Sequence, residues 1–258
     1  MNFGFTDEQE ALRALAVQVL DDHGPMGSPP EPFDRSLWKA MVVSGLVGAP
    51  LAAPAGADLG LIGLGIVAEE LGRRAALQPF GATVGAVLVL ERLGAPAAAG
   101  LAQRVADGEA VATFALEEAV GFDPRQPTTQ ARRDGTAWRL SGQKVGVPYA
   151  ESADVLLVGA MSDGGPVLAV VDRTAPGVGL RSAVGTDDEP CGSVDLDQVE
   201  VADDDVFGGP ALGITTDMAT AAWCAAAAGL IEGGLRITSD YIAAREQFGR
   251  PIATFQGP

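Results

Sequence analysis

The residues best suited to bind a ligand lie at 245–256, in the run REQFGRPIATFQ. Arg245 carries a permanent planar charge that suits phosphate groups, and Gln247 and Gln256 offer amide donors and acceptors. Phe248 adds an aromatic surface beside them. Taken alone, the segment is better explained as a helix end followed by a solvated arginine, so the rest of the chain must supply the context.

Few other side chains could do chemistry. The chain has one histidine, His23, and because Gly24 follows it, the pattern indicates the last turn of a helix. With one histidine at a helix end, the chain is not expected to form a Ser-His-Asp triad or a multi-histidine metal site, and we expect no metal. The two cysteines, Cys191 and Cys224, indicate neither a disulfide framework nor a metal knuckle, which fits a reducing cytoplasm.

Composition narrows the classes of partner. The 258 residues carry a net charge of −17, which argues against binding to nucleic-acid backbones. The opening residues, MNFGFTDEQE, do not resemble a signal peptide. The most apolar region, around Ala219–Ile231, is mostly alanine, so we expect no membrane span and a cytoplasmic protein.

Three regions of the sequence differ in composition and in the spacing of their apolar residues. Residues 1–107 predict a helical domain, with a capping box at Thr6 and helices near 61–77, 81–93 and 97–106. Residues 108–208 hold short Val- and Leu-rich runs with Gly, Pro and Asp between them, which predicts a middle antiparallel β-barrel domain. Residues 209–258 contain a long Ala-rich helix, which predicts the start of a C-terminal helical bundle. The expected class is therefore a multidomain α+β protein.

This order of elements and the closing motif resemble the acyl-CoA dehydrogenases. The most specific match runs from Tyr241 to Gln256 and includes Arg-x-Gln-Phe-Gly; softer matches are FTDEQEALR, VAEELGR and WRLSGQK. The resemblance covers the whole chain. It implies a flavoenzyme that removes a proton alpha to an acyl-CoA thioester with a glutamate and passes a hydride from the beta carbon to FAD.

The resemblance also implies a role for the closing motif. In the family, this segment reaches across a subunit interface to the adenine and pyrophosphate half of a neighbour's FAD. By that resemblance, Arg245 would contact the pyrophosphate, Gln247 and Gln256 would hydrogen-bond, and Phe248 would pack against the adenosine. Gly249 would permit the turn that ends the helix.

Two flavin-contacting segments depart from the family pattern. Where the family has Thr-Glu-Pro-x-Ala-Gly-Ser-Asp, this chain has FALEEAVGFDP, which places Glu117 at the threonine, Ala119 at the proline and Phe122 at the serine. The family's Lys-x-Trp-Ile-Thr becomes KVGVP, with Gly146 for the tryptophan and Pro148 for the threonine. Proline has no N–H or hydroxyl to donate to a flavin.

No residue is predicted to be the catalytic base. One family position for the glutamate lies beyond residue 258, and the other falls on Ala219. Asp217 is two residues from that position and so on another helical face, while Glu232 is better explained as a surface or interhelical contact.

Three hypotheses follow. The favoured one is the degenerate partner subunit of a heteromeric acyl-CoA dehydrogenase, of the kind that degrades steroid side chains. It would act with another subunit on a bulky or steroid-derived acyl-CoA and contribute FAD contacts in trans. The alternatives are a non-catalytic binding protein that has lost flavin, and a shortened ordinary homotetrameric enzyme.

Overall fold

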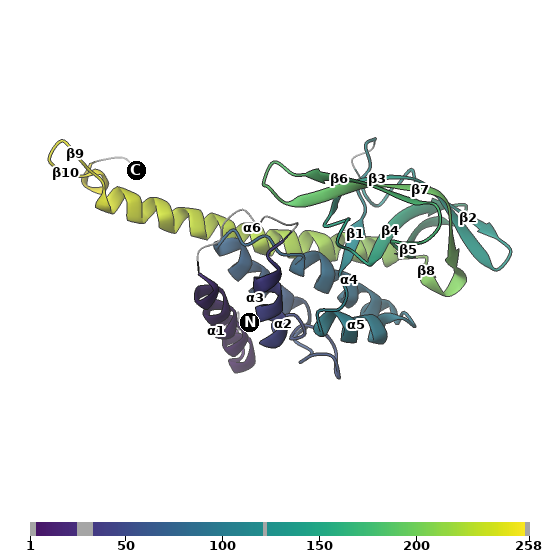
Figure 1. The fold of residues 1–258 in the computed structure, drawn as a ribbon, viewed down its shortest axis with the longest axis horizontal. Helices are drawn as coiled ribbons and strands as arrows, with labels where there is room; N and C mark the ends of the chain where they lie inside the picture. The colour runs from purple at the N-terminus through teal and green to yellow at the C-terminus, as the bar shows by residue number, and fades with distance from the viewer. Residues whose placement is uncertain (1–3, 25–32, 121–122, 256–258) are drawn as a thin grey trace.

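The computed structural model describes residues 4–24, 33–120 and 123–255. Five helices come first and form one layer of the molecule (Figure 1). They are α1 (Asp7–His23), α2 (Arg35–Val43), α3 (Gly60–Arg73), α4 (Phe80–Leu93) and α5 (Ala98–Ala106). The helices expected from periodicity are confirmed, except that α3 ends at Arg73 rather than near residue 77.

The ends of α1 follow the local rules. Thr6 accepts a hydrogen bond from the backbone of Gln9 at 3.3 Å, and the Gln9 side chain accepts one from the backbone of Thr6 at 3.0 Å, which completes the capping box. The helix ends at His23, and Gly24 is the cap, with φ of 88°. The structure adds a partner for the histidine, because His23 Nε2 lies 2.8 Å from a carboxylate oxygen of Asp34.

Eight strands follow and form one sheet. They are β1 (Ala112–Ala115), β2 (Gln130–Asp134), β3 (Ala137–Pro148), β4 (Val155–Ser162), β5 (Gly165–Asp172), β6 (Val178–Val184), β7 (Pro190–Ala202) and β8 (Val206–Phe207). The strands pair in the order β6-β7-β3-β2-β4-β5-β8, and β1 pairs with β4.

The predicted antiparallel barrel is wrong in two respects. Within the described residues, the end strands β6 and β8 do not pair, so the sheet is open. Two pairings are parallel, β1 with β4 and, at one position, β2 with β4. Closure and strand direction depend on contacts between segments far apart in the chain, which periodicity does not report.

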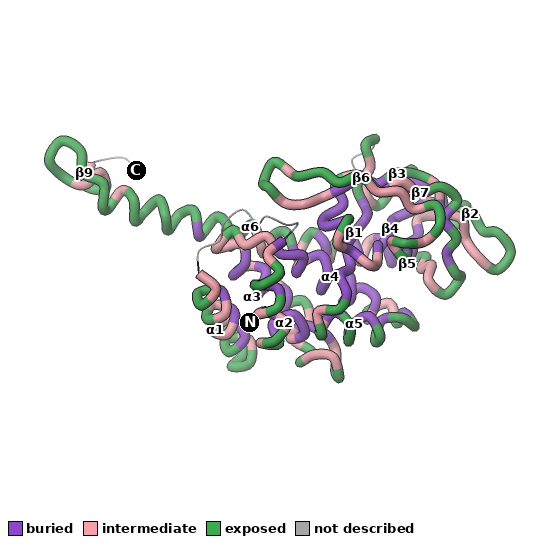
Figure 2. The backbone as a smooth tube through the Cα atoms, in the orientation of Figure 1, coloured by how far each residue is buried: buried purple, intermediate pink, exposed green. Residues whose placement is uncertain are grey.

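The core has two parts. The larger apolar cluster joins α1–α5 with β1 and the first half of α6 (Ala211–Ala244), and the smaller one lies within the sheet. Figure 2 shows this buried band running from the helical layer into the sheet. Because α6 joins both layers, it fixes how the sheet sits over the helices (Figure 1).

The close packing of α6 on α3 depends on two glycines of α6. A Cβ atom at Gly229 would lie 1.9 Å from the carbonyl oxygen of Glu69, and one at Gly233 would lie 2.2 Å from that of Arg73. Glycine alone permits such close backbone approach. The adjacent Glu232 carboxylate accepts a hydrogen bond from Arg73 at 2.5 Å, which confirms the predicted interhelical contact.

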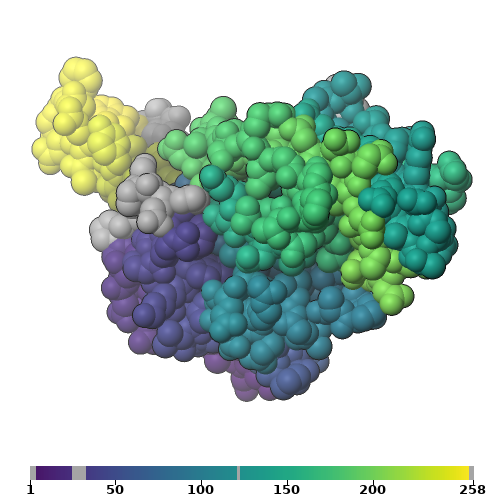
Figure 3. Space-filling view, turned by 45° about the vertical axis from the view of Figure 1, so that its right-hand side comes forward, coloured from purple at the N-terminus to yellow at the C-terminus, as the bar shows by residue number. Residues whose placement is uncertain are grey.

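Beyond Gly233, α6 leaves the body of the molecule. Its last turns are exposed and project outward (Figures 1 and 2), as the space-filling view also shows (Figure 3). Among the described residues, α6 is the one helix long and apolar enough to cross a bilayer, which the sequence analysis did not predict. Length and composition alone meet this criterion, and the first part of α6 packs on α3 and α4.

Candidate functional site

The closing motif forms a small hairpin at the far end of α6. The helix ends at Ala244, and strands β9 (Glu246–Gln247) and β10 (Arg250–Pro251) pair antiparallel. Phe248 and Gly249 make the turn with φ of 52° and 78°, so the glycine serves the hairpin rather than the helix end that the sequence predicted. A short 3₁₀ turn, η2 (Ile252–Thr254), follows the hairpin.

The side chains of this hairpin face outward. Arg245 and Gln247 are exposed, and Phe248 is 95% exposed. Phe248 meets Phe255 edge to face at 6.4 Å, and Arg250 stacks over Phe255 at 4.1 Å. Gln256 lies outside the described residues. The predicted nucleotide-binding residues from 245 to 248 thus sit together, on a projection rather than in a cleft of their own chain.

The sheet places the two departures of β3 in different environments. Gly146 is exposed, has φ of +59°, and a Cβ there would meet no atom within 4 Å. It lies in an irregularity of the β3–β7 pairing, so the backbone as well as the missing indole differs from a regular strand. Pro148 is buried, and its carbonyl oxygen accepts a hydrogen bond from Thr113 Oγ1 at 2.6 Å.

In the segment after β1, Glu118 makes the hydrogen bonds that hold the backbone, and not Glu117, which the sequence analysis placed at the flavin-binding position. Glu117 is exposed, whereas Glu118 accepts a hydrogen bond from buried Lys144 at 2.6 Å. Glu118 also accepts hydrogen bonds from the backbone of Thr128 and Thr129 at 2.6 and 2.9 Å. These bonds lower the pKa of Glu118 to about 2 despite its burial. Ala119 is exposed, and Phe122 lies outside the described residues.

Asp217 is not placed to act as a base in the core. Its carboxylate is 73% exposed and lies 2.5 Å from a guanidinium nitrogen of Arg125. Ala219, the family position, is buried. The two residues therefore occupy different faces of α6, as the helical spacing predicted.

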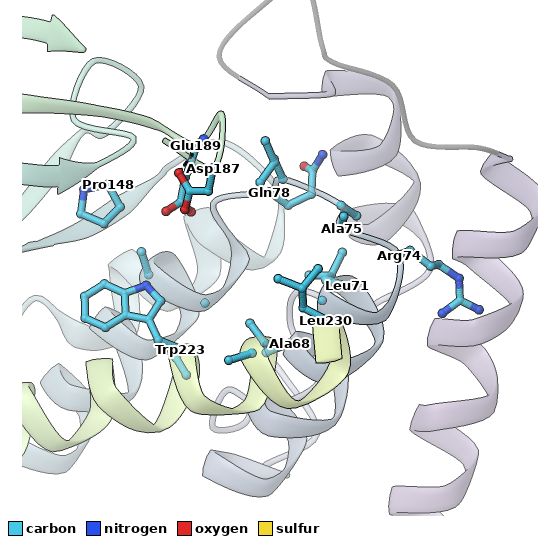
Figure 4. A pocket seen from close by; sticks show the side chains of 18 of the residues that line it. Ala68, Leu71, Arg74, Ala75, Gln78, Pro148, Asp187, Glu189, Trp223 and Leu230 are labelled. Carbon is cyan, nitrogen blue, oxygen red and sulfur yellow. Dashed lines mark hydrogen bonds between the residues drawn. The ribbon is translucent and has the colours of Figure 1, made fainter. Parts of the chain in front are cut away.

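A cavity of about 590 Å³ lies between the helices, the sheet and α6. The sequence analysis did not find it, because its lining comes from five separate segments. One wall is apolar and is formed by Ala68 and Leu71 of α3 and by Trp223 and Leu230 of α6, as Figure 4 shows. The other end holds Gln78, Pro148, Tyr149, Asp187, Asp188 and Glu189.

The polar end of this cavity is acidic. Asp187, Asp188 and Glu189 belong to the turn between β6 and β7, and Figure 4 shows the carboxylates of Asp187 and Glu189 together above Trp223. Burial and the neighbouring charge of Asp187 together raise the pKa of Glu189 to about 7. Burial also raises the pKa of Tyr149, with Glu189 adding to the effect.

The FAD implied by the sequence resemblance fits one of these regions and not the other. The hairpin offers an exposed guanidinium and an exposed aromatic ring, which suit a pyrophosphate and an adenine. The cavity does not fit a flavin: Pro148 has no donor to offer, and the acidic residues Asp187, Asp188 and Glu189 line the space.

Comparison with known proteins finds relatives of this chain in one protein family. Residues 112–199 match the family model "Acyl-CoA dehydrogenase, middle domain". The chain is 36% identical to the acyl-CoA dehydrogenase FadE28 of Mycobacterium tuberculosis over 99% of its own length and 70% of the relative's. It is 29% identical to FadE27 of the same organism over 99% of its length and 70% of that relative.

Solved structures agree with these relatives. The Tcur3481-Tcur3483 steroid ACAD variant superposes with a TM-score of 0.92 at 37% identity, covering 97% of this chain and 70% of that one. The ChsE4-ChsE5 complex of Mycobacterium tuberculosis gives a TM-score of 0.88 at 28% identity over 99% and 72%. A glutaryl-CoA dehydrogenase of Mycobacterium smegmatis in complex with FADH2 shares the fold at 22% identity, with a TM-score of 0.81 over 98% and 69%. The chain belongs to the acyl-CoA dehydrogenase family of FAD-dependent oxidoreductases.

Proposed function

We propose that this chain is one subunit of a heteromeric acyl-CoA dehydrogenase, and that it contributes FAD contacts to an active site whose catalytic base belongs to another subunit. The observation that carries the proposal is the contrast between the two candidate regions. Arg245, Gln247 and Phe248 project from the molecule, while the chain's own cavity lacks the groups that a flavin needs. A bulky, steroid-derived acyl-CoA thioester is the proposed substrate class.

Each proposed contact follows from the chemistry of its side chain. Arg245 would pair with the pyrophosphate, and among the described residues no carboxylate forms an ion pair with it. Gln247 would hydrogen-bond to the nucleotide, and Phe248 would cover the adenine, which would bury a ring that is 95% exposed in the chain alone. When bound, FAD accepts the hydride that leaves the acyl chain.

The exposed apolar side chains of α6 support the proposal that the partner is another protein subunit. Ile231, Leu235, Ile237 and Tyr241 are between 58% and 72% exposed and lie on the projecting part of the helix or just before it. Large apolar side chains exposed on one projecting segment favour a protein interface there. The names of two similar structures, a Tcur3481-Tcur3483 pair and a ChsE4-ChsE5 complex, describe assemblies of two different chains.

Co-expression with a neighbouring acyl-CoA dehydrogenase gene tests the proposal. Native mass spectrometry of the purified assembly should report both chains and bound FAD. In the same assembly, Arg245→Ala should weaken FAD binding by roughly ten- to a hundredfold, because a charged hydrogen bond contributes about 1.5–3 kcal/mol. Arg92→Ala, which removes an exposed arginine of α4, is the matched control and should leave FAD content unchanged.

Three outcomes would contradict the proposal. If the chain alone binds FAD and oxidises a thioester, it is an ordinary enzyme and needs no different partner. If every assembly containing it is colourless, the non-catalytic alternative holds. If Arg245→Ala retains FAD as fully as Arg92→Ala does, the hairpin does not contact the cofactor.

A further inference from the structure

The cavity beneath the β6–β7 turn combines two unlike walls. Its apolar wall contains Leu71, Ala222, Trp223 and Leu230, and its volume of about 590 Å³ falls in the range of small-molecule sites. Its polar end holds three carboxylates within three successive residues, Asp187 to Glu189. A cavity built in this way selects a ligand by the charge of its polar group.

The basic residue at the cavity does not offset these carboxylates. Arg74 lines the cavity, but its guanidinium is held by Asp21 at 2.7 Å and by the buried carboxylate of Glu70 at 2.9 Å. A ligand with an anionic head would therefore meet the charges of Asp187 and Glu189 at short range, with no cation free to compensate among the described residues that line the cavity.

One buried polar atom of the lining residues is also unsatisfied. Within the described part of the chain, Gln78 Oε1 has no hydrogen-bond partner. The Gln78 amide is oriented by its Nε2, which donates to the carbonyl oxygen of Asp34 at 3.2 Å, so its oxygen is left as an acceptor. An unpaired buried acceptor is costly, and together with the carboxylates the Gln78 oxygen makes this end rich in acceptors.

We infer that this cavity is a binding site for an apolar small molecule whose polar end donates hydrogen bonds and carries no negative charge. The apolar wall would cover the body of the ligand, and the acceptors would receive a hydroxyl or an ammonium group. The inference goes beyond the proposed role in FAD binding and does not depend on it, because ligand binding here is measured without flavin chemistry.

Three probes with the same apolar tail and different head groups test whether the cavity excludes a negatively charged head. Decan-1-ol, decylammonium and decanoate are titrated into the purified full chain, and into its assembly if one forms, at pH 8 by calorimetry. Decan-1-ol or decylammonium should bind at least roughly tenfold more tightly than decanoate, since each places donors at the acceptors. The tighter of the two identifies a hydroxyl or an ammonium head. Equal or tighter binding of decanoate would overturn the inference.

Adjacent alanines of α6 assign the binding to this cavity. Ala227 lines it and is exposed, whereas Ala228 is also exposed and is not among the lining residues. Ala227→Phe should remove one bound decan-1-ol per chain, and Ala228→Phe should remove none. This comparison separates the cavity from any site on a second subunit, and bound FAD measured in the same samples reports separately on the proposed function. An unchanged stoichiometry in Ala227→Phe, or an equal loss in both variants, would refute the assignment.

Charge removal within the cavity provides the second variant. Glu189→Gln keeps the size of the side chain and removes a negative charge near the ligand head. The preference for decan-1-ol over decanoate should shrink by roughly tenfold, while Asp163→Asn, an exposed residue in the turn between β4 and β5, should leave it unchanged. A preference that Glu189→Gln does not alter would show that the carboxylate end does not select the head group.

Discussion

The two halves of α6 have similar composition and opposite surroundings. Up to Gly233, the helix packs against α3 and α4, and its backbone approaches theirs so closely that no Cβ fits at Gly229 or Gly233. From Gly234 onward it carries exposed Leu235, Ile237 and Tyr241. A single helix thus completes the core of this chain at one end and presents exposed apolar side chains at the other.

Electrostatics follows the same division. The cavity beside the packed half is lined by carboxylates, while the projecting half ends in a hairpin with Arg245 and Arg250 exposed. The proposed phosphate contact therefore lies at the basic side chains of the projecting end and away from the acidic cavity. Under the proposed function, nucleotide binding in this chain is directed outward.

The boundary between the two halves can be tested with two neighbouring glycines. Gly233→Ala should destabilise the chain by about 2–3 kcal/mol, because the new Cβ meets the Arg73 carbonyl oxygen. Gly234→Ala meets no atom within 4 Å and should stabilise it by about 0.5–1 kcal/mol through helix propensity. Urea unfolding followed by circular dichroism measures both, and equal effects would place the boundary elsewhere.

The interface proposed for the projecting half predicts an effect on assembly alone. Ile237→Asp should weaken association with a partner by about 2 kcal/mol, because it buries a charge in an apolar contact. Ile237 is 67% exposed in the chain, so its unfolding free energy should change by no more than about 0.5 kcal/mol. Val43→Asp, at a 78% exposed position on α2, is the control. Analytical ultracentrifugation that finds both variants alike would remove Ile237 from the interface.

The acidic end of the cavity predicts a pH dependence of stability. The pKa of Glu189 is about 7 in the folded chain and near 4.5 when the carboxyl is solvated, so the folded state holds this proton more tightly. Stability should therefore fall as pH rises from about 4.5 to about 7 and stay level above, with Asp187 and Tyr149 as the facing groups.

Removing this charge sharpens the contrast with the basic hairpin. At pH 8, Glu189→Gln should be more stable than the parent chain by roughly 1–2 kcal/mol, and the difference should vanish by about pH 4. Thermal unfolding across this pH range measures the change, with Asp163→Asn as the control. A gap between Glu189→Gln and parent that does not vary with pH would show that Glu189 is not ionised against a penalty.

Local signals predicted local structure well. The Thr6 capping box, the end of α1 at His23 and the long strands β3, β4, β5 and β7 all follow from short-range patterns that the structure confirms. The polar strand β2, QARRD, was missed because it lacks Val, Ile and aromatic residues and is held by its pairing with β3. The open sheet was missed for a related reason, since strand order is set by distant partners.

The same distinction between local and long-range signals applies to the candidate sites. The hairpin residues could be named as candidates because they are contiguous, and their spacing survives in any fold that exposes them. The cavity was not found because Tyr149, Glu189, Gln78 and Trp223 come from separate elements, and a turn such as DDEP gives no sign that it lies over a helix.

By itself, the sequence determined the family, the secondary structure of most segments and the cofactor-like chemistry of residues 245–248, because each depends on residue order and short-range energetics. Only the tertiary structure decided that this chemistry points away from the chain and that carboxylates close the chain's own cavity. The first depends on where α6 leaves the core, which is fixed by backbone contact at Gly229 and Gly233 across more than 150 residues of sequence. The second depends on the β6–β7 turn, which brings its acidic residues to a cavity that α6 also lines.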